Sequence, residues 1–406
     1  MFLWLQGAYL LFQCFLIVVP VIDLRIFILF CRQGINTYLA GTMKKYTLIF
    51  FLLLLCHIAQ AQYPKLVPGF NKLEYIELLK ISALQRDTPW TYKNVPPPEL
   101  SHLIYRSPVM GLRNRWDLWL RKDNVGIISI RGTTAEAESW LENFYLAMVP
   151  ASGSVKISDS HTFDYNLATH PQAAVHLGWL IGLACLQQDI VSKIDSLYET
   201  GVTDFIITGH SQGGAIACLL VSHLANLQRN ERMPQDINFK TYTSGAPKPG
   251  NIYYAYDYES ITQNGKAFNV VNTADWVPET PASIQNKNDF ALINPFTNAE
   301  KIFDKLKFPK NVFLKHQYKR LTKPTEKVRR RYQRFFKKYL YKEIHKILPG
   351  YEQPPFYNSL NYQRTGVTIV LVPDEEYFRI FKNNSDNLFV HHFIEPYLYL
   401  AKRLNY

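Results

Sequence analysis

Cysteine is scarce in this chain, with five residues among 406. None of the five has the spacing of metal ligands, and together they give no disulfide framework. Cys14, Cys31 and Cys56 lie in the N-terminal region, whereas Cys185 and Cys218 lie in apolar helical patterns. Because a free cysteine behaves as a small hydrophobic residue, we expect the last two to be buried and reduced. The sequence therefore predicts neither a metal site nor a disulfide-stabilised scaffold.

Acidic residues are also in short supply, since 33 Asp and Glu face 45 Lys and Arg and leave a formal net charge of +12. A basic balance is compatible with nucleic acid, an anionic membrane surface or an acidic substrate as partner. Hydrophobic residues make up 47% and charged residues 19%, which excludes wholesale disorder. The length allows one large domain with an insertion, or two domains, and no internal repeat is evident.

Residues 43–61 have the pattern of a secretory signal peptide. A positive segment at 43–45 precedes an apolar run at 46–58 and the cleavage pattern Ala-Gln-Ala at 59–61. Cleavage there would give a secreted or periplasmic chain. Residues 1–42 are either an over-extended start or a membrane anchor, in which case the chain would be membrane-anchored. We favour the over-extended start, because a complete signal peptide rarely begins at an internal methionine by accident.

Strands and helices alternate along the remainder, residues 62–406. We expect helices at 71–85, 135–148, 173–198, 215–228 and 393–404, and strands at 115–121, 125–130, 204–208, 239–243, 267–272 and 367–372. This alternation predicts one α/β domain with a mostly parallel central sheet and helices on both faces. In such sheets the functional site lies at the carboxyl ends of the strands.

The segment at 204–215, DFIITGHSQGGA, contains a Gly-x-Ser-x-Gly pattern between an apolar strand and a helix. In that context the pattern is a nucleophile elbow, where only a very small residue fits two positions before and after the serine. Gly209 and Gly213 occupy those positions, and the helix directs backbone N–H groups toward a developing oxyanion. A glycine-rich turn without chemistry is the weaker interpretation. The segment predicts an α/β-hydrolase fold with Ser211 as nucleophile.

A serine hydroxyl is a weak nucleophile without a base, and in this fold the carboxylate and the histidine follow the serine along the chain. Asp275 lies in the loop after the apolar strand at 267–272, where an orienting carboxylate is expected. His391 and His392 follow the strand at 367–372. The residues alone leave the choice between these two histidines open.

Five ordered motifs between residues 115 and 280 resemble the class 3 (fungal-type) lipase family. They are IISIRGT at 127–133, VHLGW at 175–179, GHSQGGA at 209–215, SGAPKPGN at 244–251 and VNTADWVP at 271–278. Trp179 and Ser244 stand where the family has phenylalanine. The resemblance implies Ser211 as nucleophile and Asp275 as carboxylate. Many members have a His followed after four residues by Tyr-Leu, which favours His392 over His391.

The resemblance further implies an oxyanion hole made by Thr133, through its backbone N–H and its hydroxyl, and by the N–H of Gln212. Such a site needs no metal and no cofactor. The implied activity is that of a lipase cleaving acylglycerol esters through an acyl-enzyme, with a lipid or another ester as substrate. A phospholipase A1 is an alternative within the same class. A catalytically inactive homologue that binds lipid or anionic surfaces is an alternative from a different class.

The insertion at 295–362 departs from the family pattern. Residues 301–346 contain 17 Lys and Arg but only three Asp and Glu, and residues 327–348 have the spacing of a basic amphipathic helix. The insertion is either a solvated excursion or a cap over the active site that docks on anionic membrane lipid. The family's usual lid corresponds to residues 135–143. No nucleic acid and no obligate protein partner are expected, because a single basic helix without a binding motif is a poor nucleic-acid site.

Overall fold

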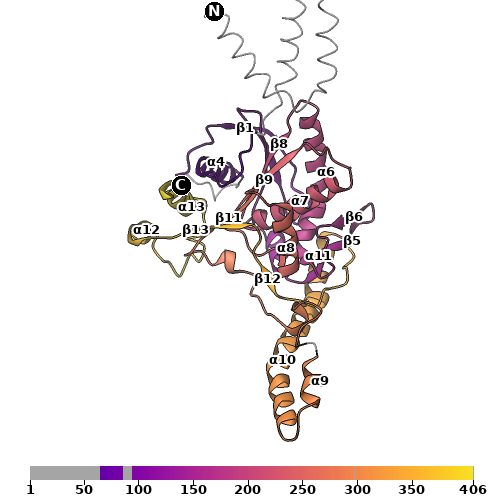
Figure 1. The fold of residues 1–406 in the computed structure, drawn as a ribbon. Helices are drawn as coiled ribbons and strands as arrows, with labels where there is room; N and C mark the ends of the chain where they lie inside the picture. Colours follow the sequence, from indigo (N-terminus) through magenta and orange to yellow (C-terminus); the bar gives the residue numbers. More distant parts are fainter. Residues whose placement is uncertain (1–64, 86–93, 297, 406) are drawn as a thin grey trace, which may run out of the picture. The chain divides into compact units, whose positions relative to one another are not determined.

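The structure of the chain, a computed structural model, describes residues 65–85, 94–296 and 298–405 (Figure 1). The predicted signal peptide at 43–61 and the predicted start or anchor at 1–42 lie outside these residues. Residues 64–406 belong to one compact unit, and the following description concerns that unit.

Seven strands form the central sheet in the order β1-β2-β3-β8-β9-β11-β13. Their bounds are β1 (Ser101–Arg106), β2 (Trp116–Arg121), β3 (Gly126–Ile130), β8 (Asp204–His210), β9 (Asn238–Ser244), β11 (Ala267–Asn272) and β13 (Val367–Leu371). The β1–β2 and β2–β3 pairs are antiparallel, and the four pairs from β3 to β13 are parallel. The predicted mostly parallel sheet is therefore confirmed.

Helices cover both faces of this sheet. Neighbouring residues of a strand point to opposite faces, and on β8 the residues of both faces are buried under helices. On β8, Ile206 packs in a cluster with Leu398, whereas Ile207 packs in another cluster with Leu180 and Leu219. The first cluster includes residues of α4 (Lys72–Ala83) and α13 (Ile394–Arg403), and the second includes residues of α6 (Leu177–Tyr198) and α7 (Gln212–Arg229). The nucleophile turn thus lies at the end of a strand that is buried on both faces.

Two small sheets were not expected from the sequence. One has the order β12-β10-β7-β4 and the other pairs β5 with β6. Their bounds are β4 (Met148–Pro150), β5 (Ser152–Ser158), β6 (His161–Asn166), β7 (Ala174–His176), β10 (Gly250–Asn251) and β12 (Tyr362–Gln363). Two further helices are α8 (Ile252–Ile261) and α12 (Glu375–Ile380), which precedes α13.

Two predicted helices were too long. The helix expected at 173–198 begins only at Leu177, because β7 pairs with β4 and β10 instead of joining the helix. His176 is its N-cap, and its Nδ1 accepts a hydrogen bond from the Trp179 N–H at 3.3 Å. The helix expected at 135–148 is shortened to α5 (Ala137–Phe144), since the chain enters β4 at Met148.

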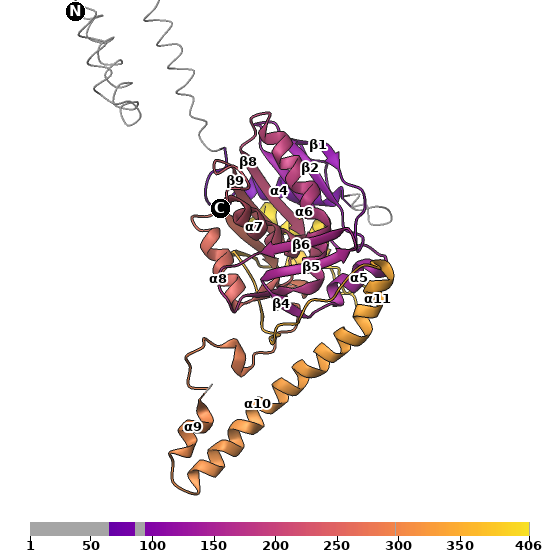
Figure 2. The ribbon, with the colours of Figure 1, turned by 90° about the vertical axis from the view of Figure 1, so that its right-hand side faces the viewer.

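The basic insertion forms α9 (Ala299–Asp304), α10 (Lys310–Phe335), a π-helical segment (Phe336–Leu340) and α11 (Tyr341–Ile347). The basic helix begins 17 residues earlier than predicted, and Pro324 lies inside it. In Figures 1 and 2, α9 and the outer part of α10 lie side by side and extend away from the sheet. We call residues 298–328 the basic arm.

The inner end of the insertion is anchored in the core. Phe336, Leu340 and Ile344 are buried, and the Phe336 ring packs edge-on against Tyr145, which directly follows α5. Arg329 is also buried, and its guanidinium donates a hydrogen bond to Asn358 at 2.7 Å. Residues 329–347 therefore belong to the body of the domain, whereas the basic arm does not.

Candidate active site

Ser211 occupies the turn between β8 and α7 with φ 61° and ψ −134°, a strained backbone conformation for a residue with a side chain. A Cβ atom on Gly209 would overlap the backbone of Gly213, and one on Gly213 would overlap the carbonyl oxygen of Ile130. The Ser211 N–H donates to the carbonyl of Ser244 on β9 at 2.8 Å, which ties the turn to the sheet. The sequence thus explains the turn locally, since both close approaches require glycine.

Asp275 and His392 are adjacent in space although 117 positions separate them in the chain. The Nδ1 atom of His392 lies 2.7 Å from Oδ2 of Asp275. The same oxygen accepts a hydrogen bond from the Tyr397 hydroxyl at 2.7 Å, and Oδ1 accepts one from the Val277 N–H at 3.0 Å. These donors satisfy a carboxylate that is buried within the domain. They also hold it in one orientation against the imidazole.

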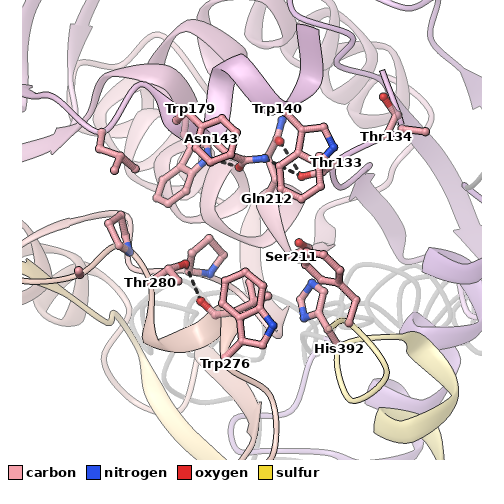
Figure 3. A pocket seen from close by; sticks show the side chains of 18 of the residues that line it. Thr133, Thr134, Trp140, Asn143, Trp179, Ser211, Gln212, Trp276, Thr280 and His392 are labelled. Atoms are coloured by element: carbon pink, nitrogen blue, oxygen red, sulfur yellow. Dashed lines mark hydrogen bonds between the residues drawn. The ribbon is translucent and has the colours of Figure 1, made fainter. Parts of the chain in front are cut away.

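His392 also lies next to Ser211, and both residues line the same pocket (Figure 3). Its Nε2 atom is buried and has no hydrogen-bond partner among the described residues. The arrangement therefore leaves that nitrogen available to accept a proton, while Nδ1 is turned to Asp275.

The neighbouring histidines are engaged elsewhere. The His391 ring lies between the Tyr377 hydroxyl at 2.8 Å and the Asn383 amide oxygen at 2.7 Å, and burial lowers the pKa of His391. The Nε2 atom of His210 lies 2.7 Å from the carbonyl oxygen of His392. Of the two histidines that the sequence left open, the structure brings His392 to Asp275 and Ser211.

Thr133 and Gln212, the predicted oxyanion residues, also line this pocket. The Thr133 hydroxyl donates to Oε1 of Gln212 at 2.9 Å and accepts from the Asn143 side-chain amide at 2.8 Å. Because a hydroxyl has a single proton, the Thr133 side chain has none left for an oxyanion in this arrangement. The backbone N–H of Thr133 and that of Gln212, at the unpaired start of α7, remain as donors.

The pocket has a volume of about 300 Å³ and a largely apolar wall that includes several aromatic side chains. Trp140 contacts Phe389, and Phe389 contacts Trp276, with ring centroids 5.8 and 5.2 Å apart. Phe144 on α5 is 55% exposed and stacks on Trp140. An apolar rim thus joins α5, in the predicted lid segment, to the loop after β11 and to the segment between α12 and α13.

None of the residues that line this pocket comes from 295–362. The insertion therefore does not close over the pocket in this structure, and its role as a cap stays a prediction. Sequence reasoning also missed Asn143, Tyr397 and Phe389, which support or line the site. Of these three, only Tyr397 could have been identified from the sequence, because it is the tyrosine of the His-x-x-x-x-Tyr-Leu pattern.

Within the described residues, no group of three or more His, Cys, Asp or Glu side chains could hold a metal ion. The same residues include no helix long and apolar enough to cross a membrane. Cys218 is buried and Cys185 is half-buried, and both are free thiols.

Comparison with known proteins agrees with the motifs. Residues 127–285 match the family model of Lipase (class 3). A secreted mono- and diacylglycerol lipase 1 of Fusarium solani is 26% identical over 193 residues, which cover 46% of this chain and 50% of that protein. A phospholipase A1-II 1 of Oryza sativa subsp. indica is 22% identical over 169 residues, covering 38% of this chain and 39% of that protein.

Among solved structures, Rhizomucor miehei triacylglyceride lipase is similar, with a TM-score of 0.39 and 20% identity over 53% of this chain and 77% of that one. The chain spans about half or less of the length of the curated relatives it matches. The matched segment contains the β8–α7 turn, Thr133 and Asp275, and stops before His392. Residues 127–285 of the chain are thus similar to the class 3 lipase family, and the rest of the chain lies outside this match.

Proposed function

We propose that this protein hydrolyses carboxylic esters of lipids with Ser211 as nucleophile, His392 as base and Asp275 as the orienting carboxylate. The observation that carries the proposal is the arrangement at the end of β8. A strained serine, a histidine with a free Nε2 and a carboxylate bonded to Nδ1 meet at an apolar pocket. An inactive lipid-binding homologue would have no need for this combination.

The chemistry follows from these positions. Oγ of Ser211 attacks the ester carbonyl carbon while its proton passes to Nε2 of His392. The backbone N–H groups of Thr133 and Gln212 stabilise the oxyanion, and each such donor is typically worth about 10²–10³ in rate. The alcohol leaves with the proton from His392, and water then hydrolyses the acyl-enzyme by the same steps. No metal or cofactor takes part in this scheme.

The proposed substrates are acylglycerols, with phospholipids as the second candidate. The aromatic rim of Trp140, Phe144, Trp276 and Phe389 suits an acyl chain, and Phe144 and Trp276 are exposed enough to contact lipid. One relative is named a mono- and diacylglycerol lipase and another a phospholipase A1, which supports both candidates. The secreted relative and the signal-peptide pattern at 43–61 support export from the cell.

The basic arm supplies a second part of the proposal, namely docking on an anionic lipid surface. It carries nine Lys and Arg against three acidic residues. In the whole of 301–346, four basic residues form ion pairs, and the rest have no ion-pair partner among the described residues. The four are Lys315, Arg329, Arg330 and Lys346. Like charges concentrated on an outlying element repel one another, so the arm is suited to a surface of opposite charge.

Large apolar side chains accompany these charges. Phe308 is 81% exposed, and Val312, Phe313 and Leu321 on α10 are also exposed. A helix with cationic and apolar side chains in water lies in the plane of a lipid interface, where each Lys or Arg contributes about 1 kcal/mol near anionic lipid. Co-sedimentation with phosphatidylserine vesicles tests this part.

The catalytic proposal is tested by assaying a panel of nitrophenyl esters of increasing chain length, followed by diacylglycerol, triacylglycerol and phosphatidylcholine. The wild type should cleave esters, and Ser211→Ala should be inactive on all of them. Ser244→Ala, a buried serine of β9 beside the turn, is the matched control and should keep measurable activity. A wild type inactive at every chain length, or a fully active Ser211→Ala, would refute the proposed function.

A further inference from the structure

Glu142, near the C-terminal end of α5, is a completely buried carboxyl group with no cationic partner among the residues that the structure describes. Its Oε2 accepts a hydrogen bond from the Asn114 side-chain amide at 2.7 Å. Its Oε1 is also buried and makes no hydrogen bond to the described residues. A buried acid with so few partners is costly, so its retention calls for an explanation at this site.

Two glycines of α6 leave the space that the Glu142 side chain and backbone occupy. A Cβ atom on Gly182 would overlap Oε1 of Glu142, and one on Gly178 would overlap the Glu142 carbonyl oxygen. The two glycines are four residues apart and so lie on the same face of α6. The close packing of α5 against α6 fixes the carboxyl in place, with Asn114 as its neighbour.

A closed ring of side chains leads from this carboxyl to the oxyanion donors. The Asn114 amide bridges Glu142 and Gln212, since its oxygen accepts from Nε2 of Gln212 at 3.4 Å. Gln212 accepts from the Thr133 hydroxyl, which in turn accepts from Asn143. Asn143 is the residue after Glu142, so the ring starts and ends on α5. We call these five side chains the amide ring.

We infer that Glu142 is a positioning residue that acts through Asn114 to hold Gln212 and Thr133, and with them the oxyanion donors, in their working geometry. The inference rests on the proposed function, because it concerns the same site. Glu142 itself does not line the pocket. Its effect should therefore appear in kcat, where the oxyanion matters, rather than in substrate affinity.

The ring depends on the protonation state of Glu142. Burial raises the pKa of this carboxyl to about 8, against a smaller opposing effect of the Asn114 and Gln212 amides. In the neutral acid, Oε1 of Gln212 accepts the Thr133 hydroxyl while its Nε2 faces Asn114. Once ionised, the carboxylate attracts the N–H groups of both amides more strongly, which pulls Nε2 of Gln212 toward Glu142 and strains the bond between its Oε1 and Thr133. We therefore expect kcat to fall as pH rises through about 8.

Other titratable groups around Glu142 do not change charge in this range. Burial, together with the nearby charge of Glu142, raises the pKa of the Cys185 thiol on α6 to about 12. His176, which with Glu142 flanks Gly178, is neutral because burial lowers its pKa to about 3. One turn earlier on α5, Glu138 lies at the surface, 3.9 Å from Arg113.

The test compares pH profiles of kcat, between pH 6 and 10, for the wild type, Glu142→Gln and Glu138→Gln on a soluble nitrophenyl ester. Ser211→Ala provides the blank for spontaneous hydrolysis. The wild type and Glu138→Gln should lose at least about threefold in kcat between pH 7 and 9. Glu142→Gln has no carboxyl to ionise, so this alkaline fall should be absent from its profile, while KM shows no matching change.

Identical profiles for the wild type and Glu142→Gln, or a wild type without an alkaline fall, would overturn the inference. If Glu142→Gln does not fold, carboxyl ¹³C NMR of the wild type replaces it. A glutamate that titrates together with the kinetic fall supports the inference, and a fall without such a glutamate contradicts it. An active Ser211→Ala would instead remove the proposed function, so the two failures are distinguishable.

Discussion

The body around Ser211 and the basic arm differ in how their charged side chains are paired and buried. In the body, the buried Asp275 carboxylate receives hydrogen bonds from Tyr397 and Val277 and faces His392. In the arm, most cationic side chains face solvent without an ion-pair partner among the described residues. The first arrangement fixes the positions of the site atoms, whereas the second leaves exposed positive charges that can interact with an anionic surface.

The difference predicts that the proposed ester hydrolysis and the proposed attachment to lipid can be separated in this chain. A buried hydrogen-bonded site depends on geometry and is insensitive to salt, whereas exposed charges act through a screened field. Changes in the body should therefore alter turnover of every ester. Changes in the arm should alter only what happens at a charged lipid surface.

The largest effect is expected from Asp275→Asn. Loss of the carboxylate leaves the His392 tautomer and the imidazolium unsupported, and in serine triads this lowers kcat by about 10⁴. Stopped assays on a soluble nitrophenyl ester measure it, with Asp236→Asn, an exposed aspartate, as control. Vesicle binding by Asp275→Asn should equal that of the wild type. A loss of less than tenfold would remove Asp275 from its proposed role.

The opposite result, weaker vesicle binding with unchanged turnover, is expected from an arm variant. In this variant Lys319, Arg320, Lys323 and Lys327 are all changed to Glu. These four side chains are exposed on α10. At about 1 kcal/mol for each cationic residue near anionic lipid, affinity for phosphatidylserine vesicles should fall by about 10²–10³ at low salt. Turnover of a soluble ester should not change, because the pocket contains no residue of the arm.

The matched control changes Lys122, Arg229, Arg232 and Lys266 to Glu, which alters the net charge equally on exposed positions of the body. Binding measured by co-sedimentation should fall far less in this control. Equal losses in the two variants would show that net charge alone, and not the arm, attracts the vesicles. Wild-type binding that does not weaken with added salt would also contradict the proposal.

The parts of the site that the sequence predicted are those whose constraints are local in the chain. The turn at Ser211 was predictable because its constraints are local, with glycine required two residues before and after the serine. Asp275 was predictable because it follows an apolar strand directly. The choice of His392 needed the family pattern around Tyr397, since the residues alone did not separate it from His391.

Contacts between distant segments were not predictable. The amide ring joins Asn114 to residues 28 and 98 positions away, and in the sequence Glu142 looks like an ordinary surface residue of a helix. The strand Ala174–His176 was missed because its partners β4 and β10 come from other parts of the chain. The burial of Phe336 was not predictable either, because the sequence showed only that it lies in the basic amphipathic helix expected at 327–348.

A smaller effect, on stability, is expected from Glu142→Gln. Because the pKa of Glu142 is raised from 4.5 to about 8, the folded state binds more protons than the unfolded state between these pH values. Stability of the wild type therefore falls as pH rises through this window. The variant lacks this proton, so it should exceed the wild type by about 2–4 kcal/mol at pH 8. At pH 4 the two should be nearly equal in urea unfolding, and a constant difference across pH would contradict this reasoning.

The smallest effect is expected from His391→Gln, the neighbour of the proposed base. His391 bonds to Tyr377 and Asn383 and not to Asp275, so its loss should lower kcat by less than about tenfold. His392→Gln should lower kcat as strongly as Asp275→Asn, since the imidazole of His392 is the one that lies against Asp275 and beside Ser211. Both are measured on a soluble ester, with circular dichroism as the folding control. A larger loss at position 391 than at 392 would mean that the imidazole beside Asp275 is not the base.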